Sequence, residues 1–386
     1  MKKDSELIKK AVKICKEERE KARANGKGGT NWPGKKALEA YPDILPCVID
    51  ELDEIICVIG TNGKTTTCRL IDNILTKAGI GHAHNREGAN LLGGILTTLL
   101  LNYDDNCHPK NKTALLECDE MAFAQLSSLL NPKIIVCTNL FADQEFPLLV
   151  HVEQVTGYLI KAILKCPNAI LCLNSDCKQS MKIAEAVPNQ KIFYSVKDKT
   201  AFVDGKIIKT GMLFDSAAYT YNAAAACAFA KAYRISENTS ISAIHTTKPA
   251  FGRMESIRIG NHTVIIEMMK NTGGFKAFSD YAIEHAQNKI LIMSVWDINP
   301  KFTKWMENVD FSPLFSLFAK VYTSGPGETA KTFLDYPSVS WLSEEALYNK
   351  IIESEQDVIV LVDYDGNIDI HNLLAKKNIL RPFWEN

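Results

Sequence analysis

A lysine and four threonines lie close together in residues 58–67, directly after a run of apolar side chains. The run Ile55–Ile59 predicts a buried strand, and a helix is expected from Thr66 to about Lys77. A glycine-containing turn between them delivers Lys64 and Thr65 to the start of that helix. Helix N-termini attract anions, a lysine there reaches terminal phosphates, and a threonine hydroxyl is a ligand for Mg²⁺. The segment therefore predicts a cradle for the phosphates of ATP.

The spacing departs from the strict pattern G-x-x-x-x-G-K-[ST], because Val58 stands where the first glycine should be. A glycine turn that merely carries a surface lysine is the alternative interpretation. The order of strand, turn and helix favours the phosphate cradle. The residues expected to bind the nucleotide from this loop are Thr61, Asn62, Gly63, Lys64, Thr65 and Thr66.

Further glycine-rich and polar motifs follow one another along most of the chain. They are Gly29–Gly34, Asn85–Asn90, Glu117–Glu120, Thr138–Gln144, Gly252–Glu255 and Lys270–Gly274. Together with the short loop form G-T-x-G-K-T-T, this ordered set resembles the Mur ligase superfamily and, within it, the MurT-like branch. The resemblance implies an α/β fold with a central P-loop domain built on a parallel sheet and a C-terminal α/β domain.

The resemblance also implies an activity. Mur-type ligases transfer the γ-phosphate of ATP to a carboxylate, and a nitrogen nucleophile attacks the resulting acyl phosphate. MurT-like proteins work with a GatD-like glutaminase and amidate the D-glutamate of lipid II, a peptidoglycan precursor. ATP, Mg²⁺, a lipid-linked carboxylate and a GatD-like glutaminase partner are expected accordingly. A paralogous ligase that joins a different carboxylate and amino acid, and a non-catalytic ATP-binding partner subunit, remain as alternatives.

Glu117 ends an apolar strand and matches the position where Mur-type ligases place a carboxylate on the Mg²⁺ of ATP. The resemblance implies that Thr65 and Glu117 hold the metal, and that Lys64 and Glu117 are catalytic. Mg²⁺ takes one or two carboxylates together with phosphate oxygens and water, which agrees with this set. Asp119 and Glu120 match acidic residues of the family, or are solvated loop carboxylates.

The resemblance assigns Asn139 and Asp143 to the phosphate or metal side, although Ala142 replaces an arginine of the family. Asn222 matches an asparagine that contacts adenine. Tyr219 occupies the position of a second asparagine one helical turn earlier, so the adenine contacts are expected to be altered.

Arg253 matches an arginine that reaches the phosphates when the C-terminal domain closes. Lys270 and Asn271 match a MurT-like stretch. Each of the three residues has a surface position as its alternative.

Two departures from the MurT-like pattern concern metal and catalysis. Typical members carry a four-cysteine zinc ribbon, but the interval 169–222 contains only Cys172 and Cys177, so no structural zinc is expected. In the C-terminal domain, Asn299 and Phe302 replace two aspartates of the family and leave Asp297 as the local acid. Asp297 is therefore the catalytic candidate for the amidation step, with a structural role in the turn before Pro300 as the alternative.

The composition is that of an ordinary globular protein, with 46% hydrophobic and 23% charged residues in a chain of 386. A net charge of −1 argues against nucleic acid as a partner. The eleven cysteines are scattered among apolar residues, which favours reduced, buried thiols. The sequence shows no apolar signal core and no apolar run of membrane-spanning length, so a cytoplasmic location is expected.

Three segments are expected: residues 1–50, an ATP-binding domain at 51–248 and a C-terminal domain at 249–386. The middle segment alternates helical patterns with the strand patterns Ile55–Ile59, Thr113–Leu116, Ile134–Cys137, Ala169–Leu173 and Lys191–Tyr194. Residues 5–24 predict a basic amphipathic helix. Docking on its own domain is the preferred interpretation, and a peripheral position on the inner membrane face is the alternative.

Overall fold

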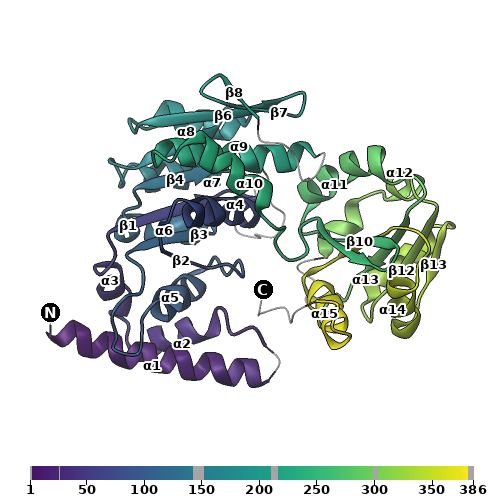
Figure 1. The fold of residues 1–386 in the computed structure, drawn as a ribbon, viewed down its shortest axis with the longest axis horizontal. Helices are drawn as coiled ribbons and strands as arrows, with labels where there is room; N and C mark the ends of the chain where they lie inside the picture. The colour runs from purple at the N-terminus through teal and green to yellow at the C-terminus, as the bar shows by residue number, and fades with distance from the viewer. Residues whose placement is uncertain (1, 26, 142–151, 210–215, 299–302, 381–386) are drawn as a thin grey trace. The chain divides into compact units, whose positions relative to one another are not determined.

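The computed structural model describes residues 2–25, 27–141, 152–209, 216–298 and 303–380. The described residues up to Thr247 form one compact unit, and those from Lys248 onward form a second (Figure 1). Asp143, Asn299 and Phe302 lie outside the described residues. The described helices include none that is long and apolar enough to cross a membrane.

The first unit is built on an eight-stranded sheet with the order β2-β3-β1-β4-β5-β6-β7-β8. Its strands are β1 (Glu54–Ile59), β2 (His82–His84), β3 (Thr113–Glu117), β4 (Ile134–Cys137), β5 (Ile170–Asn174), β6 (Lys191–Lys197), β7 (Thr200–Val203) and β8 (Lys206–Ile208). In this order the strands from β2 to β6, β1 included, are parallel, whereas β7 and β8 form an antiparallel hairpin that turns on Asp204-Gly205. Every predicted strand of this sheet is present, and the short β2 was missed.

Helices cover both faces of this sheet. They are α1 (Lys2–Ala24), α2 (Trp32–Ala40), α3 (Ile44–Ile49), α4 (Lys64–Lys77), α5 (Leu92–Leu101), α6 (Glu120–Leu130), α7 (Val152–Ile163), α8 (Lys178–Ala186), α9 (Ala217–Ala232) and α10 (Glu237–Thr246). Alternate side chains of β1 enter different cores: Cys57 packs on the face of α1, α5 and α6, and Val58 packs on the face of α4, α9 and α10. Burial on both faces explains why the strand reads as a continuous apolar run.

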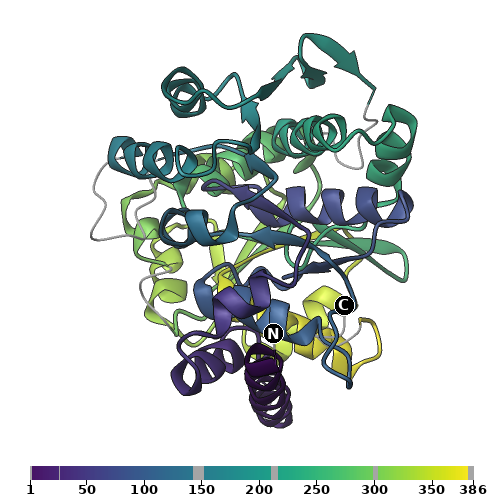
Figure 2. The ribbon, with the colours of Figure 1, turned by 90° about the vertical axis from the view of Figure 1, so that its left-hand side faces the viewer.

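The N-terminal helices α1, α2 and α3 contribute to the core on the Cys57 face of the sheet (Figure 2). Ile8, Ala11, Val12 and Cys15 of α1 are buried, which confirms the prediction that this helix docks on its own domain. Gly34 lies inside α2. A Cβ atom on Gly34 would lie 2.1 Å from the Gly93 carbonyl oxygen of α5, so the glycine permits the two helices to pack closely.

The second unit has a six-stranded sheet with the order β13-β12-β11-β14-β10-β9, in which only β9 is antiparallel to its neighbour. Its strands are β9 (Glu255–Ile259), β10 (His262–Met268), β11 (Ile290–Ser294), β12 (Lys320–Ser324), β13 (Val339–Trp341) and β14 (Val358–Val362). Its helices are α11 (Thr272–His285), α12 (Ser312–Phe315), α13 (Glu328–Thr332), α14 (Glu344–Ile352) and α15 (Tyr364–Lys376), with short 3₁₀ turns at Lys304–Asn308 and Phe333–Asp335. The predicted α/β class, with two mostly parallel sheets, is confirmed.

Candidate nucleotide-binding site

The loop between β1 and α4 can form only with glycine at two positions. Gly60 has φ +126° and Gly63 has φ +82°, in the region that other residues rarely adopt. A Cβ atom on Gly60 would lie 2.3 Å from the Thr138 hydroxyl oxygen, and one on Gly63 would lie 2.2 Å from the Asn222 amide oxygen. Because Gly63 turns the chain so sharply, α4 begins at Lys64, two residues earlier than predicted.

Residues after β4 hold this loop in place. The Asn62 N–H donates to the Asn139 side-chain oxygen at 2.9 Å, and the Asn139 amide nitrogen donates to the Asn62 carbonyl oxygen at 3.0 Å. The Thr138 hydroxyl donates to the same carbonyl oxygen at 2.7 Å. The Asn139 side chain therefore positions the loop backbone, and its predicted direct contact with the nucleotide stays a prediction.

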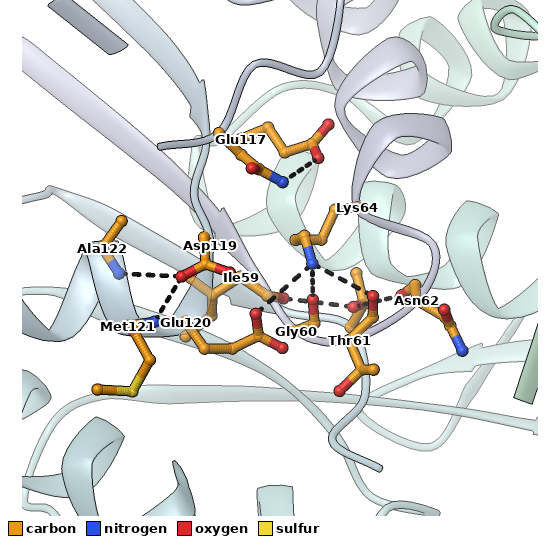
Figure 3. Close-up of polar contacts among 12 residues, drawn as sticks. Ile59, Gly60, Thr61, Asn62, Lys64, Glu117, Asp119, Glu120, Met121 and Ala122 are labelled. Carbon is orange, nitrogen blue, oxygen red and sulfur yellow. Dashed lines mark hydrogen bonds and ion pairs between the residues drawn. The ribbon is translucent and has the colours of Figure 1, made fainter. Parts of the chain in front are cut away.

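The Lys64 ammonium lies over the loop (Figure 3). It donates to the carbonyl oxygens of Gly60 and Thr61, the latter at 3.2 Å. Its Nζ atom is also 3.6 Å from the Glu120 carboxylate, and the lysine side chain is only 11% exposed. A nearly buried cation thus sits in the turn where the sequence predicts phosphates.

Glu117 lies at the end of β3, opposite Val58 of β1, and is 2% exposed. The Asn90 amide donates to its Oε1 at 3.0 Å. The Oε2 atom is buried, and it has no hydrogen-bond partner among the residues that the structure describes. A buried carboxylate oxygen without a donor is costly in free energy, which indicates a place for a cation.

The Thr65 hydroxyl lies close to the same carboxylate. A Cβ atom on Gly88, which follows β2, would lie 3.6 Å from both Thr65 Oγ1 and Glu117 Oε2. A hydroxyl and a carboxylate that both face Gly88 supply hard oxygen ligands, which suit Mg²⁺ because this ion prefers such ligands and keeps part of its water shell. The residues present therefore fit the expected metal.

Asp119 and Glu120, whose roles the sequence left open, have different contacts in the structure. Asp119 is the N-cap of α6, and its carboxylate accepts from the N–H groups of Met121 at 2.9 Å and Ala122 at 3.1 Å. Glu120, in the first turn, faces Lys64. Neither is a solvated loop carboxylate. Aspartate is favoured at this position because its carboxylate accepts from the first N–H groups of a helix. No sequence signal places Glu120 on the lysine.

Asn222 also reaches the loop. It lies on α9, which begins at Ala217. Its side-chain oxygen accepts from the Thr67 hydroxyl at 3.3 Å and packs against Gly63. Thr67 was not predicted as a site residue. Burial raises the pKa of Tyr219, one turn earlier, to about 12. The predicted contact of Asn222 with adenine stays a prediction.

The remaining candidates belong to the second unit. Arg253 donates to the Met268 carbonyl oxygen at 3.1 Å. Glu267 lies nearby, and burial raises its pKa to about 7 although the Arg253 charge opposes the shift. Asn271 caps α11 by accepting from the Gly274 N–H at 2.9 Å. The predicted contact of Arg253 with phosphates stays a prediction, and Asn271 has a structural role in its own unit.

Asp297 follows β11 in a left-handed conformation, with φ +53°. The hydroxyl of Thr303 donates to its Oδ1, and that of Thr329 donates to its Oδ2 at 2.7 Å. Its backbone N–H donates to Asp363, the N-cap of α15, at 2.8 Å. Both carboxylate oxygens thus have donors within the second unit. The arrangement accounts for a structural role, and the catalytic role stays a prediction.

We expect the change Asp297→Asn to lower the melting temperature. Asparagine tolerates the left-handed backbone, but the charge-assisted bonds from two hydroxyls weaken, at a cost of about 2 kcal/mol. Calorimetry of the wild type and the variant measures this loss. Unchanged turnover per folded molecule would exclude a catalytic role, and a large loss of turnover with intact ATP binding would support it.

We also expect well under one zinc ion per chain in purified protein, to be measured by elemental analysis. Cys172 lies within β5 and Cys177 is the N-cap of α8, and both are buried. A closed zinc site needs four ligands. Stoichiometric zinc that survives dialysis against a chelator would contradict this prediction.

Comparison with known proteins agrees with the geometry. A family model described as the Mur ligase middle domain matches residues 58–244. The chain is 26% identical to the lipid II isoglutaminyl synthase (glutamine-hydrolyzing) subunit MurT of Staphylococcus aureus (strain COL), over 79% of this chain and 82% of that one. It is 36% identical to the MurT subunit of Streptococcus pneumoniae (strain ATCC BAA-255 / R6), over 38% of this chain and 32% of that one.

Solved structures share the fold. MurF from Acinetobacter baumannii superposes with a TM-score of 0.69 at 17% identity, covering 91% of this chain and 81% of that chain. E. coli FolC in complex with DHPP and ADP gives a TM-score of 0.64 at 15% identity, covering 86% of this chain and 92% of that chain.

Proposed function

We propose that this chain, which belongs to the Mur ligase family of ATP-dependent amide-forming ligases, amidates a carboxylate of a peptidoglycan precursor. The observation that carries the proposal is the buried Glu117 carboxylate, with one oxygen lacking a donor in the described part of the chain, beside the Thr65 hydroxyl. A site of this kind at the end of a phosphate loop suits Mg-ATP.

The proposal gives a task to the loop and to the residues that surround it. The N–H groups at the start of α4 and the Lys64 ammonium bind the phosphates. Thr65 and Glu117 hold Mg²⁺, and Thr138 and Asn139 fix the loop that carries them. Mg-ATP supplies the phosphoryl group that converts a carboxylate into an acyl phosphate. The protein supplies position and charge, which are the main contributions to catalysis of phosphoryl transfer.

The relatives support the choice of the acceptor carboxylate and of the nitrogen source. The name of the S. aureus relative describes a glutamine-hydrolyzing synthase that acts on lipid II, and this chain spans most of that subunit. We therefore propose the D-glutamate carboxylate of lipid II as the acceptor and ammonia from a GatD-like glutaminase as the nucleophile. A lipid-linked acceptor would place the reaction at the inner membrane face.

The test is release of phosphate from ATP by the purified chain. Lipid II would be offered with ammonium chloride, and separately with glutamine and a GatD-like glutaminase. We expect ADP, phosphate and a product in which mass spectrometry finds an amide in place of the D-glutamate carboxylic acid. ATP binding without turnover under both conditions would contradict the proposed acceptor.

One observation favours a second candidate. Both oxygens of Asp297 accept hydroxyl donors, so this acid is already engaged within its own unit. A ligase that joins a different carboxylate to an amino acid would not need Asp297 for a reaction with ammonia. Replacing lipid II by other carboxylates and ammonium by a panel of amino acids separates the two candidates, since only the second would release phosphate with such a pair.

A further inference from the structure

We propose that Glu120 is a positioning residue for Lys64: its carboxylate attracts the ammonium and competes with the phosphates of the nucleotide for it, which weakens nucleotide binding. The inference rests on the proposed function, because it assumes that the loop binds ATP. The two partners come from elements distant in sequence, α4 and α6, and their charged atoms are 3.6 Å apart (Figure 3).

The position of Glu120 is fixed by the start of α6. Asp119 caps that helix with two hydrogen bonds to backbone N–H groups, so the first helical residue has a defined direction. Glu117 is the last residue of β3 and pairs with Val58 of β1, which brings the segment that follows it next to the loop. Glu120 is 13% exposed and Lys64 is 11% exposed, so solvent screens this ion pair only partly.

The Lys64 ammonium faces both the loop and Glu120. It donates to two carbonyl oxygens of the loop, and its Nζ atom lies 3.6 Å from the Glu120 carboxylate, which attracts its charge. Phosphate oxygens must compete with this carboxylate for the ammonium. A nucleotide also brings several negative charges beside Glu120, and like charges at short range repel strongly when solvent is largely excluded.

Glu120 therefore opposes the nucleotide in two ways. It attracts the Lys64 ammonium in competition with the phosphates, and it repels the phosphates themselves. Such opposition has a use in a ligase, because ADP must leave after each turnover and tight binding of product slows release.

The test compares the affinity for Mg-ADP of the wild type, Glu120→Gln and a matched control, by isothermal calorimetry. Glutamine keeps the shape of the side chain and removes its charge. Glu237→Gln is the control, since Glu237 also lies in the first turn after a helix cap, on α10, and is exposed. We expect Glu120→Gln to bind Mg-ADP about tenfold more tightly, while Glu237→Gln binds like the wild type.

The sign of the effect distinguishes the proposal from a merely structural role. A structural role for Glu120 would lower the melting temperature without nucleotide and would weaken ADP binding. Equal or weaker binding by Glu120→Gln would overturn the proposal. Should that variant fold poorly, Glu120→Ala provides the same comparison, with tighter binding expected again. A wild type that binds no ADP would contradict the proposed function itself, which separates that failure from failure of the inference.

Discussion

Replacing Lys64 by alanine is expected to abolish the stabilisation of this protein by Mg-ATP. A ligand at one hundred times its dissociation constant stabilises the folded state by about 2.7 kcal/mol. Lys64 is the cation held within the phosphate loop, bonded to Gly60 and Thr61, and its loss removes the main charge that opposes the phosphates. We expect a thermal shift with saturating Mg-ATP in the wild type and none in Lys64→Ala.

The control for this variant lies at the other end of the same helix. Lys77 donates to the Ser242 carbonyl oxygen at 2.8 Å and to its hydroxyl at 2.9 Å, away from the loop. Lys77→Ala should keep the full Mg-ATP shift. The melting temperatures without nucleotide must be compared first, because Lys64→Ala also removes the ion-pair partner of Glu120. A wild-type shift in Lys64→Ala would show that the nucleotide binds elsewhere.

The phosphate loop could be predicted because its signals are local. A continuous apolar run, glycines and a lysine before a helical pattern specify strand, turn and helix without long-range information. The start of α4 was placed two residues late, because the left-handed Gly63 ends the turn more abruptly than the pattern indicates.

The contacts around the loop depend on the order of the strands, which the sequence does not state. Glu117 approaches Thr65 because β3 lies beside β1 in parallel register. Glu120 faces Lys64 only because Asp119 caps α6 at that point. Asn139 could be named as a site residue, but its bonds to the Asn62 peptide follow from the pairing of β1 with β4. The sequence motifs therefore predicted several residues of the site, whereas the hydrogen bonds and ion pairs among them depend on the tertiary structure.

The second unit shows where motif matching reaches its limit. Asp297, the acid that the motif leaves in this unit, follows the end of β11. The donors to its carboxylate, Thr303 and Thr329, come from segments six and thirty-two residues further along the chain. Such partners cannot be inferred from an acidic residue and its neighbours in a motif, because any hydroxyl brought close by folding can satisfy it.

The change Glu117→Gln is expected to remove the dependence of nucleotide binding on Mg²⁺ and to lower phosphate release by about two orders of magnitude or more. Glutamine has the shape of glutamate, so the bond from Asn90 to the side-chain oxygen can persist. The variant loses the negative charge that a divalent cation requires at this site. Titration of Mg²⁺ at fixed ATP, followed by thermal shift and phosphate release, measures both effects.

Stability without nucleotide provides the internal check on this prediction. Glu117 is 2% exposed, and its Oε2 has no hydrogen-bond partner in the described part of the chain, so a charge there costs free energy until a cation arrives. In EDTA, the melting temperature of Glu117→Gln should therefore be no lower than that of the wild type. Mg-ATP should no longer raise the melting temperature of this variant. The wild type in EDTA should reproduce the weak nucleotide binding of the variant. A Mg²⁺-dependent shift of wild-type size in Glu117→Gln would assign the metal to other ligands, whereas a lower melting temperature in EDTA would make Glu117 a structural carboxylate.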